Sequence, residues 1–409
     1  MEVILSRKFF IWSLVSLFYA YQYVLRVMPN AISSICIVKF NISNIAFGQF
    51  LGLYYIGYTL AHIPIGFFLD KYGPKVILPV CAVLTVAGLI PLIISDVWLF
   101  VQIGRIVSGI GSAGAALGIF KIASMYYNEK FAKMVGFSII IGLLGAMYGG
   151  LPVLSLLDKF GWEYLFIGFI SIGLVLALLL YVFILPYNSS SNESDDVCKK
   201  LKLVLLNKYT IIISLLAGFM IGPLEGFADG WASSFLRTIS NISQESAALL
   251  PSMIFFGVCF GAFGLPYMLE KSFDSYNLLI LSAVAMLGAF VLMFIASSSV
   301  ILVLISFFIL GFFSAYQIIA TDEILRHVDS NVVALTSAVN NMIVMGFGYV
   351  FHTAISYVLD LSWDGKIVDS VPVYDKTLML NAMLCIPCGL LIGLVGFTYL
   401  KYKNKKYVN

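Results

Sequence analysis

Apolar residues in this chain occur in long blocks of roughly 20, which is the length of helix needed to cross the hydrocarbon core of a bilayer. Of the 409 residues, 61% are hydrophobic and 11% are charged, whereas a soluble domain carries about a quarter charged residues. Inside lipid, every backbone amide must be hydrogen-bonded within the protein, so such blocks form helices or barrel strands. Barrel strands would be shorter and would alternate in polarity. The sequence therefore predicts an all-α polytopic membrane protein.

Twelve such blocks follow one another along the chain. We expect transmembrane helices over residues 9–33, 46–69, 76–94, 97–124, 132–156, 164–185, 209–236, 246–269, 276–296, 299–325, 332–358 and 377–400. The longest polar stretch between them, from Pro186 to Lys208, is rich in serine and charged residues and predicts a flexible, solvated linker. The expected domains are an N-terminal six-helix bundle over 1–186, a cytoplasmic linker over 187–208 and a C-terminal six-helix bundle over 209–409. This is the layout of two parallel bundles related by an axis along the membrane normal.

The placement of lysine and arginine predicts the orientation, because these residues are enriched in cytoplasmic loops. With both termini in the cytoplasm, 16 of the 24 lysines and arginines lie in inner segments and 5 in outer ones, while Arg26, Arg105 and Lys121 lie within spans. The net charge of +3 therefore reflects topology and does not indicate nucleic-acid binding. The simplest expectation for the membrane is a bacterial inner membrane, and abundant Ile, Lys and Asn are typical of an AT-rich genome.

A short charged loop joins the second and third blocks and reads Gly66-Phe67-Phe68-Leu69-Asp70-Lys71-Tyr72-Gly73-Pro74-Lys75. It resembles the loop between helices 2 and 3 of the major facilitator superfamily, in which a glycine and three residues precede an aspartate, a basic residue, any residue, a glycine and further basic residues. Pro74 is the one departure from that pattern. The resemblance implies the major facilitator fold, with two pseudo-symmetric six-helix bundles, and transport by alternating access.

The resemblance also implies a gating role for this loop, carried by Gly66, Asp70, Lys71, Gly73 and Lys75. In the family, the glycine permits close helix contact, and the aspartate lies near a helix N-terminus, whose dipole favours an anion. We therefore expect Gly66 and Asp70 to latch the two bundles on the inner side in the outward-open state.

The first span of each half contains ionisable residues, and charges at such positions are usually functional. Arg26 and Glu225 lie 17 and 16 residues from the starts of their spans, hence at nearly equal depth, and Asp229 follows Glu225 by one turn. Tyr19 and Tyr23 share a helical face with Arg26. In one reading Arg26 binds a substrate carboxylate through two parallel hydrogen bonds, while an acid of the seventh span receives the substrate's ammonium group. In a second reading Arg26 pairs with one of these acids to close the outer gate, and in a third it snorkels to the outer interface.

The fourth span carries Arg105 beside a stripe of Gly104, Gly111 and Gly118, which recur every seven residues and predict the close approach of another helix. Arg105 points about 100° away from this stripe, a direction that suits a cavity or an internal carboxylate. An arginine followed by glycines also resembles the superfamily's fourth helix, and that resemblance implies a role in substrate or proton coupling. The alternative is a structural arginine held by backbone carbonyls.

The fifth span has Gly142, Gly145 and Gly149 on one face. The segment resembles the antiporter signature of the superfamily's drug exporters, but it lacks the Gly-Pro pair of that signature. Close helix packing is therefore the preferred interpretation of these glycines.

The later spans contribute uncharged polar groups and a histidine. Gln317 and either Asn340 or Asn341 are candidates to line the cavity, and one of the two asparagines must face away because neighbours differ by about 100°. His352 lies near the outer end of the eleventh span and can titrate. If a proton is co-transported, the two acids of the seventh span are stronger candidates to carry it.

The first span ends with tyrosines followed by Leu25-Arg26-Val27-Met28-Pro29. This segment resembles a branch of the superfamily that contains lysosomal dipeptide transporters and bacterial amino-acid permeases of intracellular pathogens. The resemblance implies an amino acid or a short peptide as substrate, and a zwitterion matches a cavity with arginines on one side and acids on the other. Sugar phosphates and other organic anions are the alternative, although acids in the seventh span would repel a dianion.

An enzyme or a sensor on the same scaffold would belong to a different functional class. An enzyme needs a nucleophile, a base or a metal set, but the three histidines stand far apart, and Cys385 and Cys388 have zinc spacing without a second ligand pair. We therefore expect no enzymatic activity, no metal and no cofactor, and a non-transporting sensor stays open. The expected partners are a small-molecule substrate, a candidate co-transported proton and the lipid bilayer, and the chain is expected to be a monomer.

Overall fold

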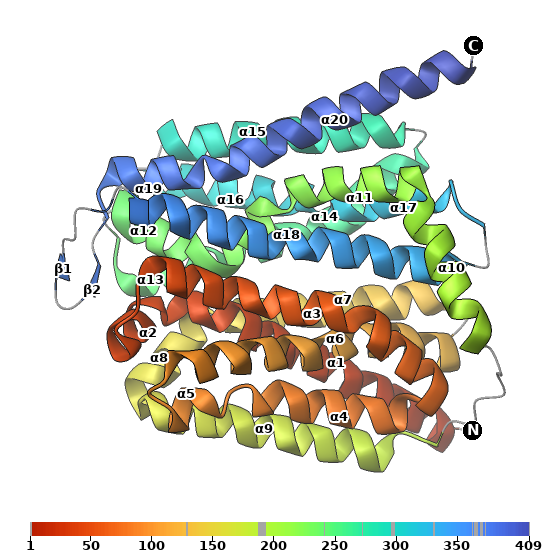
Figure 1. Ribbon diagram of the computed structural model, residues 1–409, viewed down its shortest axis with the longest axis horizontal. Coiled ribbons are helices and arrows are strands. Elements are labelled where there is room, and N and C mark those ends of the chain that lie inside the picture. The colour runs from red at the N-terminus through yellow and green to blue at the C-terminus, as the bar shows by residue number, and fades with distance from the viewer. Residues whose placement is uncertain are drawn as a thin grey trace. The chain divides into compact units, whose positions relative to one another are not determined.

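The computed structural model describes residues 2–127, 130–186, 194–240, 242–271, 273–295, 299–329, 332–361, 363, 367–368, 371–372 and 374–408. Most of these residues lie in helices (Figure 1). The chain divides into two compact units. Unit 1 comprises Met1–Ile32, Lys39–Ile42 and Leu53–Ser194, and unit 2 comprises Ser33–Val38, Ser43–Gly52 and Asp195–Asn409.

Helices follow one another with short connections in both halves of the chain. The helices before residue 187 are α1 (Glu2–Ala31), α2 (Ser33–Phe40), α3 (Asn44–Tyr72), α4 (Pro74–Ala87), α5 (Pro91–Ile94), α6 (Trp98–Tyr126), α7 (Phe131–Tyr148), α8 (Leu151–Phe160) and α9 (Trp162–Phe183). Those after it are α10 (Ser194–Leu206), α11 (Lys208–Met220), the π-helix η2 (Gly222–Trp231), α12 (Ala232–Ser240), α13 (Gln244–Leu249), α14 (Ser252–Glu270), α15 (Ser275–Ile295), α16 (Val300–Ser314), α17 (Tyr316–Leu325), α18 (Val333–Leu361), α19 (Lys376–Met383) and α20 (Cys385–Val408).

The predicted transmembrane segments are present. Among the described residues, ten helical segments are long and apolar enough to cross a membrane, and two bent helix pairs raise the number to twelve if each pair is one span. The pairs are α1 with α2, bent by 69°, and α7 with α8, bent by 46°. Pro29 precedes the first bend, and Gly149, Gly150 and Pro152 surround the second, residues that interrupt a helical hydrogen-bond ladder. The predicted all-α polytopic fold is confirmed.

The seventh predicted span, 209–236, differs from a regular α-helix because it consists of α11, η2 and α12 in succession. Pro223, near the start of η2, has no N–H to donate. The carbonyl of Ile221 instead accepts from the N–H groups of Leu224 and Glu225, both at 3.0 Å. The ladder therefore changes register where α11 meets η2.

The glycine stripes of the fourth and fifth spans are packing surfaces, as predicted. A Cβ atom added at Gly111 of α6 would overlap the carbonyl of Cys81 in α4, and one at Gly145 of α7 would overlap the carbonyl of Ala20 in α1. Glycine lets these helix backbones approach each other closely. The close approach fixes α6 and α7 against their neighbours within unit 1.

In unit 2, aromatic residues anchor η2 in the interior. Phe227 of η2 is fully buried. Its ring centroid lies 5.4 Å from that of Phe235, 5.7 Å from that of Phe290 and 5.7 Å from that of Phe307. Aromatic side chains bury about 150–250 Å² each, so a cluster of four contributes strongly to the core. The π-helix is therefore packed between α12, α15 and α16.

The linker contains a helix where the sequence predicted a flexible segment. Residues 187–193 lie outside the described part of the chain, but 194–206 form α10. The second half of α10 is composed of leucine, valine and lysine, and leucine and lysine are good helix formers. Val204 is 1% exposed, so packing adds to this propensity.

The connection between α18 and α19 contains a short antiparallel pair, β1 (Ile367–Val368) and β2 (Val371–Pro372). Next, Asp375 caps the start of α19 by accepting a hydrogen bond from the N–H of Thr377 at 3.0 Å. This cap satisfies one of the unpaired N–H groups at a helix start.

Candidate functional site

Arg26 of α1 lies among tyrosines in unit 1. Its guanidinium carbon is 4.0 Å from the ring centroid of Tyr23 and 5.9 Å from that of Tyr55 in α3, and the residue is 4% exposed. A guanidinium over aromatic rings gains about 2 kcal/mol of cation–π attraction when it is desolvated. The tyrosines therefore hold the arginine in a defined orientation.

Tyr19 and Tyr23 share one face of α1 with Arg26, as the helical period predicts. Tyr19 and Tyr23 form a T-shaped pair, with ring centroids 5.0 Å apart and hydroxyl oxygens 3.4 Å apart. Both side chains are half-buried. A Cβ atom at Gly142 of α7 would lie 2.5 Å from Cδ1 of Tyr19, so this glycine makes room for the ring. Tyr19, Tyr23 and Arg26 thus form one continuous surface on α1.

Arg105 of α6 is bonded to the backbone of α1. Its Nη1 donates to the carbonyl oxygen of Leu25 at 2.9 Å, and its Nη2 donates to that of Arg26 at 3.0 Å. In a helix the Leu25 oxygen would accept from the N–H four residues later, but that residue is Pro29, which has none. Arg105 therefore fills an acceptor that the proline leaves open. This geometry matches the alternative of an arginine held by backbone carbonyls, and it fixes the backbone of Arg26.

Tyr54 of α3 completes the surroundings of the two arginines. The guanidinium carbon of Arg105 lies 4.7 Å from the Tyr54 ring centroid, and the Tyr54 hydroxyl donates to Oε1 of Gln22 at 2.6 Å. Sequence reasoning did not assign Tyr54 or Tyr55 to the site. The signal that could have found them is a pair of adjacent tyrosines in an apolar span; in the structure Tyr54 lies near Arg105 and Tyr55 near Arg26.

In unit 2, both predicted acids lie in η2 and are deeply buried. Glu225 is 1% exposed and Asp229 is 2% exposed. The sequence predicted an α-helical turn between them, whereas the structure places them in a π-helix, whose hydrogen bonds run from residue i to i+5. π-Helical turns occur frequently at functional sites. Buried carboxylates on such a segment are therefore candidates for binding or proton transfer.

Two glycines of η2 receive side chains from α18. A Cβ atom at Gly226 would lie 2.9 Å from Cβ of Phe351, and one at Gly230 would overlap the imidazole of His352. His352 is 1% exposed. The predicted titratable histidine is thus packed against the residue that follows Asp229.

The polar residues of the tenth and eleventh spans differ in their surroundings. Oδ1 of Asn340 accepts from Oγ of Ser214 in α11 at 2.8 Å, and its Nδ2 donates to Oγ1 of Thr321 in α17 at 2.9 Å. Asn340 therefore joins three helices of unit 2. Gln317 is half-buried and donates to the carbonyl three residues before it at 3.3 Å, and Asn341 is half-buried.

Asp70 of the predicted gating loop forms an ion pair within unit 1. Its Oδ1 lies 2.7 Å from Nζ of Lys121, and the Asp70 side chain is 73% exposed. A Cβ atom at Gly66 would make an ordinary contact with Leu117 at 4.0 Å. Packing within unit 1 therefore does not require a glycine at position 66.

The end of the gating loop is a tight turn. Gly73 has a φ of 77°, a conformation that glycine adopts without strain. Nζ of Lys75 donates to the carbonyl of Ile184 at 3.2 Å, which joins the start of α4 to the end of α9. Nζ of Lys71 lies 5.2 Å from the ring centroid of Tyr72.

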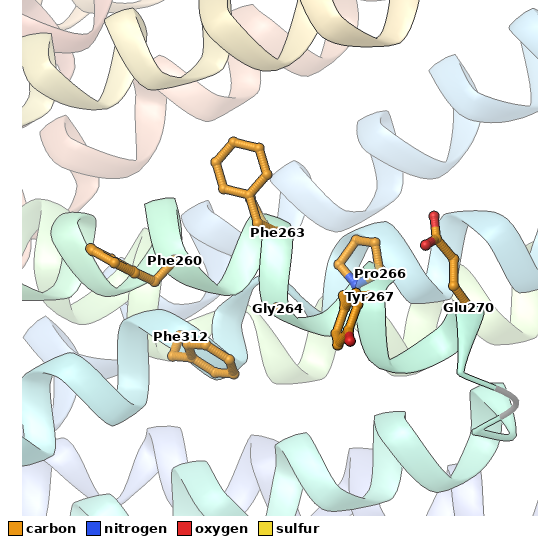
Figure 2. Close-up of a pocket in the computed structure, with 8 residues that line it drawn as sticks. Phe260, Phe263, Gly264, Pro266, Tyr267, Glu270 and Phe312 are labelled. Atoms are coloured by element: carbon orange, nitrogen blue, oxygen red, sulfur yellow. The ribbon is translucent and has the colours of Figure 1, made fainter.

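Unit 2 also has an apolar groove of about 670 Å³ along α14 and α16. Phe260, Phe263 and Tyr267 contribute to its wall, and Figure 2 shows Glu270 at one end of this row. None of the predicted binding residues lines this groove. We therefore assign the candidate site to the buried charges of the first and seventh spans.

These features define a multi-pass membrane protein whose two halves carry buried charges of opposite sign. Over residues 9–353 the chain matches the family model described as the Major Facilitator Superfamily. The chain therefore belongs to the Major Facilitator Superfamily, and it is a membrane transporter of the alternating-access type rather than an enzyme. The resemblance inferred from the gating loop is confirmed.

Solved structures of transporters share this fold. A bacterial homologue of the human lysosomal transporter Spinster, in an inward-facing and unoccupied conformation, has a TM-score of 0.75 at 16% identity, covering 97% of this chain and 98% of that one. The nucleoside transporter NupG has a TM-score of 0.73 at 14% identity, covering 96% and 99%. A D-xylose–proton symporter has a TM-score of 0.73 at 16% identity, covering 95% of each chain. No curated protein matches the sequence.

Proposed function

We propose that this transporter moves a small zwitterionic solute, an amino acid or a short peptide. The observation that carries the proposal is that the first span of each half holds buried charge of one sign, Arg26 on α1 and Glu225 and Asp229 on η2. An arginine binds a carboxylate through two parallel N–H···O bonds, and the acids attract an ammonium group. A zwitterion satisfies both kinds of charge at once.

In this proposal the predicted binding residues have different tasks. Arg26 binds the substrate carboxylate, and the half-buried Tyr19 and Tyr23 supply hydroxyl groups beside it. Arg105 contributes by fixing the backbone of Arg26. Glu225 or Asp229 receives the ammonium group and is the candidate carrier of a co-transported proton. Gln317 and one of the two asparagines, Asn340 or Asn341, complete the proposed site.

Sugar phosphates and other organic anions are the second candidate class, because unit 1 contains two buried arginines. Their geometry weakens this candidate. Both terminal nitrogens of Arg105 already donate to carbonyls of α1, so this second arginine has a structural role. The acids of the seventh span would also repel such a substrate.

The membrane setting is part of the proposal. We place the chain as a monomer in a bacterial inner membrane with both termini in the cytoplasm, because lysine and arginine concentrate on that side of the spans. Asp70 and Gly66 keep their proposed latch role on the same side.

Uptake of labelled solutes into proteoliposomes tests the proposal. A panel of amino acids, dipeptides, sugar phosphates and organic anions is first ranked by the rise in melting temperature of the purified protein, since a ligand of the native state stabilises it. We expect an amino acid or dipeptide to rank first and to be taken up with saturable kinetics. Saturable binding without flux would identify a sensor, and a leading sugar phosphate would favour the second class.

Arg26→Lys tests the carboxylate clamp directly. Lysine keeps the charge but lacks the two parallel N–H donors of the planar guanidinium. A hydrogen bond to a charged group contributes about 1.5–3 kcal/mol. We therefore expect KM for the leading solute to rise at least ~10-fold, since 1.4 kcal/mol corresponds to a factor of ten. Arg237→Lys in α12, where the side chain is exposed, is the matched control. Unchanged uptake by Arg26→Lys would contradict the clamp.

A further inference from the structure

Helix α10 is anchored at the level where the seventh span begins. It ends at Leu206, and α11 starts at Lys208. Asn207 forms the corner between them: its Oδ1 accepts from the N–H of Thr210 at 3.1 Å, and its Nδ2 donates to the carbonyl of His327 at 3.0 Å. His327 follows the end of the tenth span, so the corner is tied to the ends of two spans. The C-terminal end of α10 therefore lies at the membrane boundary.

The direction of α10 differs from that of the spans. Figure 1 shows α10, in green, running at a steep angle to α11 and α18. Its 13 residues span about 20 Å at the rise of an α-helix. A helix that starts at the boundary and crosses the direction of the spans extends along the membrane surface.

One face of α10 combines lysines with leucines. Lys199, Lys202, Leu203 and Leu206 follow the spacing i, i+3, i+4 and i+7, which places them within an arc of about 100°. All four side chains are exposed, Leu203 by 63% and Leu206 by 68%, whereas Val204 on another face is 1% exposed. Basic residues beside exposed leucines are typical of helices that lie in the membrane interface.

We propose that this face of α10 lies on the bilayer and binds acidic phospholipid headgroups. The two leucines enter the boundary of the acyl chains, and the lysines extend along them to reach lipid phosphates. The charge is complementary, because this is the lysine-rich side that the sequence assigns to the cytoplasm, where acidic lipids attract basic segments. A lysine near an anionic leaflet gives a preference of roughly fivefold for acidic over neutral lipid. This inference does not depend on the identity of the transported solute.

Quenching of a tryptophan placed on this face tests the proposal. Leu206→Trp is reconstituted into phosphatidylcholine bilayers that contain the same fraction of either brominated phosphatidylglycerol or brominated phosphatidylcholine. The signal of the parent protein is subtracted to remove its native tryptophans. We expect brominated lipid to quench the added tryptophan, and brominated phosphatidylglycerol to do so several times more strongly than brominated phosphatidylcholine.

Charge variants on the same background separate the contributions. Lys199→Gln with Lys202→Gln should abolish the preference for phosphatidylglycerol, whereas Lys130→Gln with Lys133→Gln, two exposed lysines at the start of α7, should retain it. Equal quenching by both lipids would show contact without headgroup recognition and overturn the proposal. Absence of quenching by either lipid would show that water or another protein covers this face, and would overturn it as well. Elution of each variant as a single species, with uptake retained, confirms that it is folded.

Discussion

The first span of each half contains a proline, and the two spans accommodate it in different ways. In α1, Pro29 leaves the carbonyl of Leu25 without its helical donor, and Arg105 supplies a donor from another helix at 2.9 Å. Because the lost bond is replaced, α1 continues as an α-helix through the proline to Ala31. The backbone that carries Arg26 is therefore held in place from outside its own helix.

In the seventh span, the proline leads to a change of helix type. Pro223 leaves the carbonyl of Phe219 without its helical donor, and a Cβ atom at Gly389 of α20 would overlap that carbonyl. The chain continues as η2. Its glycines allow α18 to pack closely, so side-chain packing supports this segment.

The comparison indicates a rigid support for the cation and a more adaptable support for the acids. A hydrogen bond from a charged donor to a buried carbonyl contributes about 1.5–3 kcal/mol and defines one geometry. A π-helix has weaker intrinsic preference and is usually restricted to a short turn. We therefore expect substitutions near Arg105 to lower stability through lost hydrogen bonds. Substitutions along η2 should lower it through disturbed side-chain packing.

Replacing Arg105 should have the largest effect. Arg105→Met leaves the buried carbonyl of Leu25 unpaired, at about 1–3 kcal/mol, and removes a second hydrogen bond to the carbonyl of Arg26, so we expect a lower melting temperature and loss of uptake. Pro29→Ala restores an N–H for the Leu25 carbonyl, and it should therefore stabilise the Arg105→Met protein more than it stabilises the wild type. The measurement is a double-mutant cycle from thermal unfolding, with an expected coupling of about 1–2 kcal/mol. Additive effects would show that Arg105 and Pro29 do not act on the same carbonyl.

Replacing a glycine of η2 should have the next largest effect. In Gly226→Ala the new Cβ would lie 2.9 Å from Cβ of Phe351, and overpacking of this kind costs about 1–3 kcal/mol. Gly136→Ala in α7 is the control, because a Cβ there meets nothing within 4 Å, and alanine is favoured over glycine in a helix by about 1 kcal/mol. The melting temperature should fall for the first variant and stay or rise for the second. Equal shifts would contradict close packing of α18 on η2.

A change in the gating loop should affect the rate of transport and leave both first spans intact. Asp70→Asn removes an exposed ion pair whose contribution to stability is about 0–1 kcal/mol. We expect uptake to slow severalfold, with the ranking of substrates unchanged, because the residue is proposed to act on the movement of the bundles. Competition assays with the solute panel measure this ranking. A changed ranking would argue against the latch role.

The smallest effect is expected outside the spans, at Asp375. Hydrogen bonds from Thr377, its backbone N–H foremost, lower the pKa of the Asp375 carboxyl below its ordinary value. Because the folded-state pKa is the lower one, the stabilisation is present above the unfolded-state pKa and is lost as the pH falls through the folded-state value. Asp375→Ala should therefore melt slightly below the wild type at neutral pH, and the two should converge in acid. A difference that is independent of pH would exclude the charged cap as its cause.

The sequence predicted the parts of the structure that depend on local pattern. Hydropathy and block length located the spans, and the period of the glycines predicted the packing of α6 and α7. The face shared by Tyr19, Tyr23 and Arg26 followed from the helical period. These features depend on residues within one helix, so spacing along the chain is sufficient to find them.

The missed features depend on contacts between distant segments. The distance of four residues from Leu25 to Pro29 marks an open carbonyl, but its donor is Arg105, about 80 residues away. Hydropathy does not distinguish a π-helix from an α-helix, and η2 depends on packing by Phe351 and His352. The sequence of α10 predicts a linker because its polar first half outweighs the leucines of its second half.

The two hydrogen bonds of Asn207 make this corner sensitive to chemical ageing. Spontaneous loss of the side-chain ammonia would convert the amide to a carboxylate, as the substitution Asn207→Asp does. A carboxylate oxygen can still accept from the N–H of Thr210 and keep the start of α11 capped. It has no N–H to offer the carbonyl of His327, so deamidation would release the segment after the tenth span while sparing the helix beside it.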